Sequence, residues 1–111
     1  MTFENLTKAQ QSVLLYAESC MVDRSGLLEG IRMNQEDLDA LKALQAEGVL
    51  TYGRIPSVLL EPPNRMGGAT HWVSFTDAAW EFAHTLRRER GTRVSQKRLD
   101  IDALVAERLN V

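Results

Sequence analysis

Residues 34–52 read NQEDLDALKALQAEGVLTY, and this stretch decides the fold. Leu38, Leu41 and Leu44 recur at helical spacing, so we expect a helix that buries one leucine-lined face. Asn34 can cap the first turn of that helix, with Asp37 three residues later as the reciprocal partner. Gly48 stands where a left-handed residue ends a helix, and a strand over residues 49–52 follows at once. A helix, its glycine stop and a strand thus come in immediate succession.

Upstream of this stretch, Thr7 and Gln10 have the spacing of a capping box, and apolar residues at helical spacing follow them. We therefore expect a first helix that begins after Thr7.

Residues 22–33 come next and allow two interpretations. Ser25 can cap a single short helical turn that Gly30 would end, and we favour this one. The same residues can instead be extended and pair with a later hairpin.

Downstream, a loop containing Pro62-Pro63 and Gly67-Gly68 interrupts the chain. Residues 70–75 then alternate, with His71 among the residues of one face and Trp72 on the other. We therefore expect an antiparallel hairpin with a long loop.

Two more helices are expected after the hairpin. Thr76 can cap the first, which Gly91 ends. Trp80 lies about 100° away from the apolar side of that helix; we expect it to be buried within the monomer, with a subunit interface as the alternative. A short helix over residues 100–109 should follow a polar linker. Such a helix is not stable alone in water, so its aliphatic side must pack on its own domain or on a second copy. That side consists of Ile101, Leu104, Val105 and Leu109.

Composition points to one ordinary globular domain. The chain has 111 residues, of which 44% are hydrophobic and 25% are charged. No apolar run is long enough to cross a bilayer, and the first residues lack the pattern of a secretory signal. The single cysteine, Cys20, cannot form an internal disulfide. We therefore expect a cytoplasmic protein.

The net charge of −2 conceals an asymmetry along the chain. Residues 1–50 hold eight acids and four bases, whereas residues 51–98 hold four acids and eight bases. Six of these bases fall within twelve residues, which suits a local phosphate contact or, alternatively, a solvated helix end and linker. They are Arg87, Arg88, Arg90, Arg93, Lys97 and Arg98.

Catalytic chemistry has no support in the sequence. His71 and His84 are the only histidines, and neither they nor Cys20 have the spacing of metal ligands. No serine lies in a nucleophile motif, and Gly67-Gly68 is not followed by the Lys-Ser/Thr of a phosphate-binding loop. We expect no catalytic residue, no metal site and no cofactor.

The order helix, short element, helix, strand, long loop, strand resembles that of the winged helix-turn-helix superfamily. The first part of the likeness runs from Leu27-Leu28-Glu29-Gly30-Ile31 through the spaced leucines into Glu47-Gly48-Val49-Leu50. The second, residues 73–79 (VSFTDAA), is similar to the superfamily's closing strand and following helix, although a glycine typical of that phrase is missing. The resemblance covers roughly residues 6–90.

This resemblance implies an α+β, mostly helical winged-helix fold, with a three-helix core, a β-hairpin wing and additional C-terminal helices. The winged-helix domain would occupy residues 1–91. Residues 92–111 would form a linker and a C-terminal helix that serves packing or dimerisation. Because small members commonly pair through terminal helices, a homodimer is expected.

DNA-binding members insert into the major groove the helix that corresponds to the one after Asn34. Here its polar positions hold four acids and one base, so phosphates would repel it. The wing loop and the basic cluster would have to supply most of the attraction. Besides the six clustered bases, the expected DNA contacts are Gln35, Lys42, Gln45, Arg54 and Arg65.

Two functions remain open. The first is a dimeric DNA-binding protein that regulates transcription, and the basic cluster favours it. The second is an adaptor or inhibitor whose acidic helix, through Glu36 and Asp39, binds a basic protein such as a nucleic-acid-handling enzyme. Trp80 and the aliphatic side of the last helix are further candidate protein interfaces.

Overall fold

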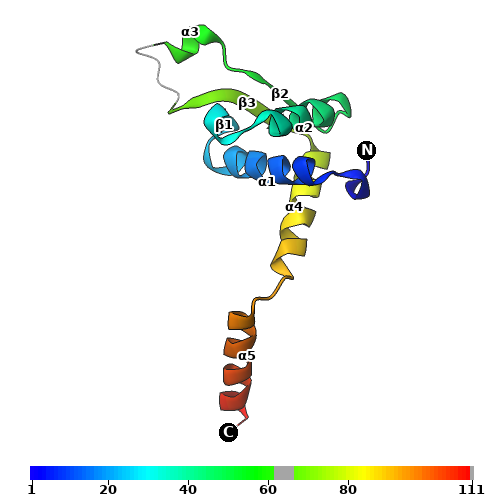
Figure 1. The fold of residues 1–111 in the computed structure, drawn as a ribbon, viewed down its shortest axis with the longest axis vertical. Helices are drawn as coiled ribbons and strands as arrows, with labels where there is room; N and C mark the ends of the chain where they lie inside the picture. Colours follow the sequence, from blue (N-terminus) through cyan, green and yellow to red (C-terminus); the bar gives the residue numbers. More distant parts are fainter. Residues whose placement is uncertain (62–66, 111) are drawn as a thin grey trace.

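The structure is a computed structural model that describes residues 1–61 and 67–110. The described residues form a mostly helical α+β fold, as the sequence predicts (Figure 1). The elements are α1 (Lys8–Asp23), β1 (Leu27–Glu29), α2 (Gln35–Ala46), β2 (Leu50–Arg54), α3 (Ser57–Leu60), β3 (Ala69–Phe75), α4 (Asp77–Gly91) and α5 (Gln96–Leu109), with 3₁₀ turns at Phe3–Asn5 and Gly30–Arg32.

The expected capping boxes are both confirmed. At the start of α1, the Gln10 amide donates to the Thr7 hydroxyl at 3.1 Å, and the Thr7 amide donates to the Gln10 side chain at 2.9 Å. Asn34 and Asp37 make the same reciprocal pair at the start of α2, at 2.9 and 3.0 Å. These bonds satisfy amides that have no partner within the helix.

Gly48 ends α2 as predicted, with a φ of +72°. The Val49 amide donates to the Leu44 carbonyl at 3.0 Å, and the Gly48 amide donates to the Gln45 carbonyl at 3.0 Å. This pair of bonds is a Schellman motif, which turns the chain back across the last helical turn. The motif directs the chain straight into β2.

The sheet is antiparallel, with strand order β1-β3-β2. The predicted hairpin is confirmed as β2 paired with β3, in a register that sets Tyr52 opposite Val73 and Arg54 opposite His71. The first strand extends to Arg54, beyond the predicted end at residue 52. The alternation of β3 also holds, since His71 is buried and Trp72 is 38% exposed.

The favoured interpretation of residues 22–33 is wrong. Ser25 does not cap a helical turn: it has a φ of +56° and forms a tight turn with Gly26. The chain then continues as β1, which pairs with β3 and places the fully buried Leu28 opposite His71. Pairing with β3 satisfies backbone groups that one short helical turn would leave open. The expected three-helix core therefore has a strand and a 3₁₀ turn where its second helix was predicted.

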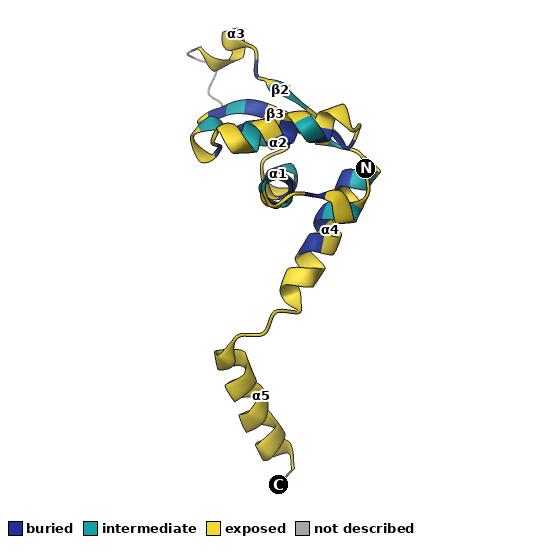
Figure 2. Cartoon of the chain, turned by 45° about the vertical axis from the view of Figure 1, so that its right-hand side comes forward, coloured by how far each residue is buried: buried dark blue, intermediate teal, exposed yellow. Residues whose placement is uncertain are grey.

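The core lies between α1, α2, α4 and one face of the sheet (Figure 2). Leu14, Leu41, Leu44 and Ala79 are each 0% exposed, so each of these helices contributes its predicted apolar side. At about 25 cal/mol per Å² of buried apolar surface, burial of this kind is the main stabilising term of such a fold.

Two expectations about the last two helices need correction. Trp80 is not buried within the monomer: it is 37% exposed, and its ring meets Phe75 edge-on with centroids 5.1 Å apart. The last helix begins at Gln96 rather than at residue 100, because Ser95 caps it through the Arg98 amide at 3.3 Å. None of its fourteen residues is buried, so α5 does not pack on its own domain.

The chain is elongated, with principal extents of 66 × 36 × 24 Å. The lower part of α4 and the whole of α5 extend away from the core as an arm, at the opposite end of the molecule from α3 (Figure 1). Within residues 1–61 and 67–110, no helix combines the length and apolarity that crossing a bilayer requires.

Candidate nucleic-acid interface

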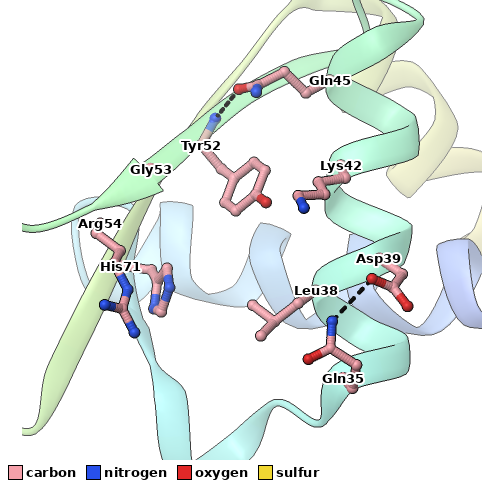
Figure 3. Close-up of a pocket in the computed structure, with 9 residues that line it drawn as sticks. All are labelled: Gln35, Leu38, Asp39, Lys42, Gln45, Tyr52, Gly53, Arg54 and His71. Carbon is pink, nitrogen blue, oxygen red and sulfur yellow. Dashed lines mark hydrogen bonds between the residues drawn. The ribbon is translucent and has the colours of Figure 1, made fainter.

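A groove of about 340 Å³ lies between α2 and the β2–β3 hairpin (Figure 3). Helix α2 forms one wall and the two strands form the other, while Leu38 and Tyr52 supply apolar surface between them. The full lining consists of Gln35, Leu38, Asp39, Lys42, Gln45, Tyr52, Gly53, Arg54 and His71. Four predicted DNA contacts, from two different elements, therefore line one groove.

Helix α2 presents different chemistry on its two exposed sides. At about 100° per residue, Gln35 and Lys42 fall on the side towards the hairpin, whereas Glu36 and Glu47 fall on the side away from it. Of the acids expected to repel DNA, Asp37 is held in the capping box, and Asp39 accepts from the side-chain Nε2 of Gln35 at 2.9 Å. Glu36 and Glu47 thus lie away from the groove, whereas Asp39 lines it.

The wall formed by β2 is fixed to α2 by a side chain of the groove itself. The Tyr52 amide lies on the open edge of the sheet and donates to the Gln45 side-chain oxygen at 2.8 Å. This bond satisfies an edge amide that pairs with no strand among the described residues. Gln45 therefore positions the groove and keeps only its amide nitrogen available for a ligand.

His71 closes the end of the groove beside Arg54. It is 8% exposed, and its Nδ1 lies 2.7 Å from the Thr70 hydroxyl. Burial lowers the pKa of His71 below its ordinary value of 6.5, and the positive charge of Arg54 lowers it further. A neutral His71 at pH 7 leaves Lys42 and Arg54 as the positive groups of the groove.

The six clustered bases do not join this groove. Arg87 ion-pairs through its Nε with Glu18, and its guanidinium donates to the Ser19 hydroxyl at 2.8 Å and to the Leu15 carbonyl at 3.3 Å. Arg87 thus ties α4 to α1 while half of its side chain stays exposed, and its contact with DNA stays a prediction. The other five are exposed as well, and they extend along the arm: Arg88, Arg90, Arg93, Lys97 and Arg98, the last paired with Asp102 at 2.8 Å.

The remaining predicted residues divide between α2, the arm and an undescribed loop. Glu36 and Asp39 are exposed on α2. The aliphatic side chains of α5 are exposed as well, from 48% for Val105 to 79% for Leu109. Arg65 lies outside the described residues.

Sequence reasoning did not include Tyr52, His71 or Leu38 in the site. Strand alternation already sets Tyr52 and Arg54 on one face, and it sets His71 on the core side of its own strand. The register of the hairpin then aligns these residues along one side of the sheet. The sequence alone predicted neither the register of β2 against β3 nor the position of α2 over that face of the sheet.

Comparison with families of known proteins, with curated proteins and with solved structures gives no match for this chain.

Proposed function

We propose that this chain is a winged-helix-type domain that binds duplex DNA through the groove between α2 and the β2–β3 hairpin, and that it regulates transcription in the cytoplasm. The observation that carries the proposal is the position of Lys42 and Arg54 on opposite walls of one groove. Two cations on opposite walls of an open groove suit a phosphate backbone lying between them.

The order of the elements supports the proposal. Helix, strand, 3₁₀ turn, helix and hairpin follow one another, and the first strand joins the sheet beside β3. This order resembles the winged-helix order of helix, short element, helix and hairpin, with a strand and a 3₁₀ turn as the short element. In such a fold α2 would lie at the major groove while the hairpin reaches the neighbouring backbone.

Hydrogen-bonding groups in the groove add to its charge. Gln35 carries an amide that can pair with a base edge or a phosphate, and Tyr52 carries a hydroxyl. The lining of the groove includes two bases, Lys42 and Arg54, and one acid, Asp39. The carboxylate of Asp39 accepts a hydrogen bond from the side chain of Gln35. The local balance therefore differs in sign from the net charge of −2 of the chain.

A salt-dependent titration with generic duplex DNA tests the proposal. Each lost phosphate contact should reduce the slope of log K against log salt by about 0.9, so Lys42→Ala with Arg54→Ala should reduce it by about 2. The matched control is Arg90→Ala with Arg93→Ala, which removes the same charge from the arm. Equal losses in both double variants, or no binding by the wild type at about 50 mM salt and micromolar protein, would refute the proposal.

A protein-binding function is the second candidate, and the acidic side of α2 away from the groove favours it. Glu36 and Glu47 there would meet a basic partner, such as a nucleic-acid-handling enzyme. Glu36→Lys with Glu47→Lys separates the two functions. The change should strengthen binding to generic duplex if DNA is the ligand, because it removes repulsion. It should abolish capture of a basic partner in a pull-down if protein is the ligand.

A further inference from the structure

The imidazole of His71 lies at the end of the groove between α2 and the hairpin, although only 8% of the residue is exposed. Its Nδ1 is engaged with the Thr70 hydroxyl at 2.7 Å, the only hydrogen bond of the ring within the described part of the chain. No buried side-chain nitrogen among residues 1–61 and 67–110 lacks a partner, so the second ring nitrogen, Nε2, must be open to solvent. Nε2 is therefore the ring atom that a ligand in the groove can reach.

The register of the hairpin holds this ring beside Arg54. The Ile55 amide donates to the Thr70 carbonyl at 2.9 Å, so these two residues form a hydrogen-bonded pair of the hairpin. The next pair, Arg54 and His71, is then a non-hydrogen-bonded pair, in which opposite side chains on one face come closest. Figure 3 shows both side chains at the same end of the groove. An anion held by Arg54 therefore lies near His71 as well.

Charged and titratable groups surround the ring from several elements. Burial lowers the pKa of His71, and the charge of Arg54 lowers it further. On the β1 side, Arg24 and Arg32 hold the pKa of the Glu29 carboxyl below its ordinary value, so Glu29 stays charged. The free groove thus keeps the ring neutral at pH 7. The groups on the elements around the ring are Tyr52 and Arg54 on β2, Asp39 and Lys42 on α2, Glu29 on β1, Arg32 in the following 3₁₀ turn and Tyr16 on α1.

A phosphate between Lys42 and Arg54 would reverse this balance. It would offset the charge of Arg54, and its own negative charge within about 4–6 Å would favour the charged imidazolium. The imidazolium donates from both nitrogens, so it would keep the Thr70 hydroxyl as one acceptor and gain a phosphate oxygen as the other. Hydrogen bonds between charged groups of this kind are roughly twice as strong as neutral ones.

We propose that His71 is a third contact of the groove to the duplex backbone, and that its ring takes up one proton from solvent when the backbone binds. This inference rests on the proposed DNA-binding function of the groove. The proton stays on the ring, with Nδ1–H directed to Thr70 and Nε2–H to the phosphate. Because binding favours the protonated ring, protonation favours binding by the same factor. Affinity for duplex DNA therefore rises as the pH falls.

The pKa of His71 in the free and the bound protein tests the proposal directly. His71 and His84 are the only histidines, so the ring signals of the isotope-labelled full chain are two, and His84→Gln assigns them. A pH titration by nuclear magnetic resonance, without DNA and with saturating generic duplex, should show a higher pKa of His71 in the complex. The pKa of His84, which lies on α4 outside the groove, should change little. An unchanged or lower pKa of His71 in the complex would overturn the proposal.

The pH dependence of the affinity is the second test. At constant salt, the affinity of the wild type for generic duplex should rise by about three- to tenfold between about pH 7.5 and 5.5, since a tenfold effect corresponds to a change of one in a pKa. His71→Gln should lose most of this rise, whereas His84→Gln should retain it. Circular dichroism checks that each variant is folded at each pH. Equal pH dependence of the wild type and a folded His71→Gln would overturn the proposal, and the titration of the wild type decides if His71→Gln does not fold.

This proposal and the proposed DNA-binding function fail in different ways. No binding of duplex DNA, or binding that Lys42→Ala with Arg54→Ala leaves unchanged, would overturn both. Binding that depends on Lys42 and Arg54 but leaves the pKa of His71 unchanged would overturn only the role of His71.

Discussion

Single residues in this fold serve both the core and the groove, and His71 is the clearest case. Its ring is buried against the core side of the sheet, yet it also lines the groove beside Arg54. Burial keeps the ring neutral at pH 7, as does the neighbouring guanidinium. Protonation of His71, a residue of the groove, should therefore lower the stability of the domain.

We expect the free energy of unfolding to fall as the pH drops below about 6.5, the ordinary histidine pKa. The unfolded chain takes up a proton there while His71 in the fold resists it, so acid favours the unfolded state until the lowered pKa is reached. Urea denaturation between about pH 7.5 and 5.5 measures this, and His71→Gln should flatten the dependence in this range. His84→Gln, at an exposed position, is the control; if it flattened the curve equally, the explanation would be wrong.

Leu41 is the central leucine of the stretch that decides the fold, and it is 0% exposed. Replacing it with alanine should destabilise the domain by about 2–5 kcal/mol, the usual range for a fully buried leucine. Chemical denaturation measures the change, and Leu99→Ala on the exposed arm should change little. A loss below about 0.5 kcal/mol for Leu41→Ala would show that the buried face of α2 has been misplaced.

At the scale of elements, the sequence predicted the features that depend on neighbouring residues. Capping at Thr7, Asn34 and Thr76, and the stop at Gly48, each involve atoms within a few residues of one another. The alternation of β3 is equally local. These signals were sufficient for α1, α2, α4 and the hairpin.

The features that the sequence did not predict depend on distant partners. Strand β1 has only three residues, too few to show alternation, and it exists because β3 pairs with it. The tie between Arg87 and Glu18 joins residues 69 positions apart. In the sequence Arg87 looks like its five basic neighbours, so only the packing of α4 on α1 distinguishes it.

This tie gives a prediction at the scale of elements. Arg87→Ala should destabilise the fold by about 1 kcal/mol or more, because it leaves the poorly exposed carboxylate of Glu18 without its partner. Arg88→Ala removes the same charge from an exposed position and should stay within about 0.5 kcal/mol of the wild type. Thermal or urea denaturation compares the two. Equal stabilities would mean that Arg87 does not hold α4 to α1.

At the scale of the whole molecule, the two groups of predicted DNA contacts lie apart. The groove group lines α2 and the hairpin, whereas the exposed bases of the basic cluster follow the arm away from the core (Figure 1). The sequence presents them as one set because it shows charge but not distance. We place the proposed DNA contact in the groove and not on the arm.

The most direct test of the proposed DNA contact is a map of the amide chemical shifts while generic duplex DNA is added to the full chain. We expect the shifts to concentrate in α2, from Gln35 to Gln45, and in β2 from Tyr52 to Arg54, and to diminish as salt is added. Residues 88–98 of the arm should change little. Shifts concentrated in the arm, or none at concentrations where a binding isotherm saturates, would contradict the assignment of the groove as the DNA-binding surface.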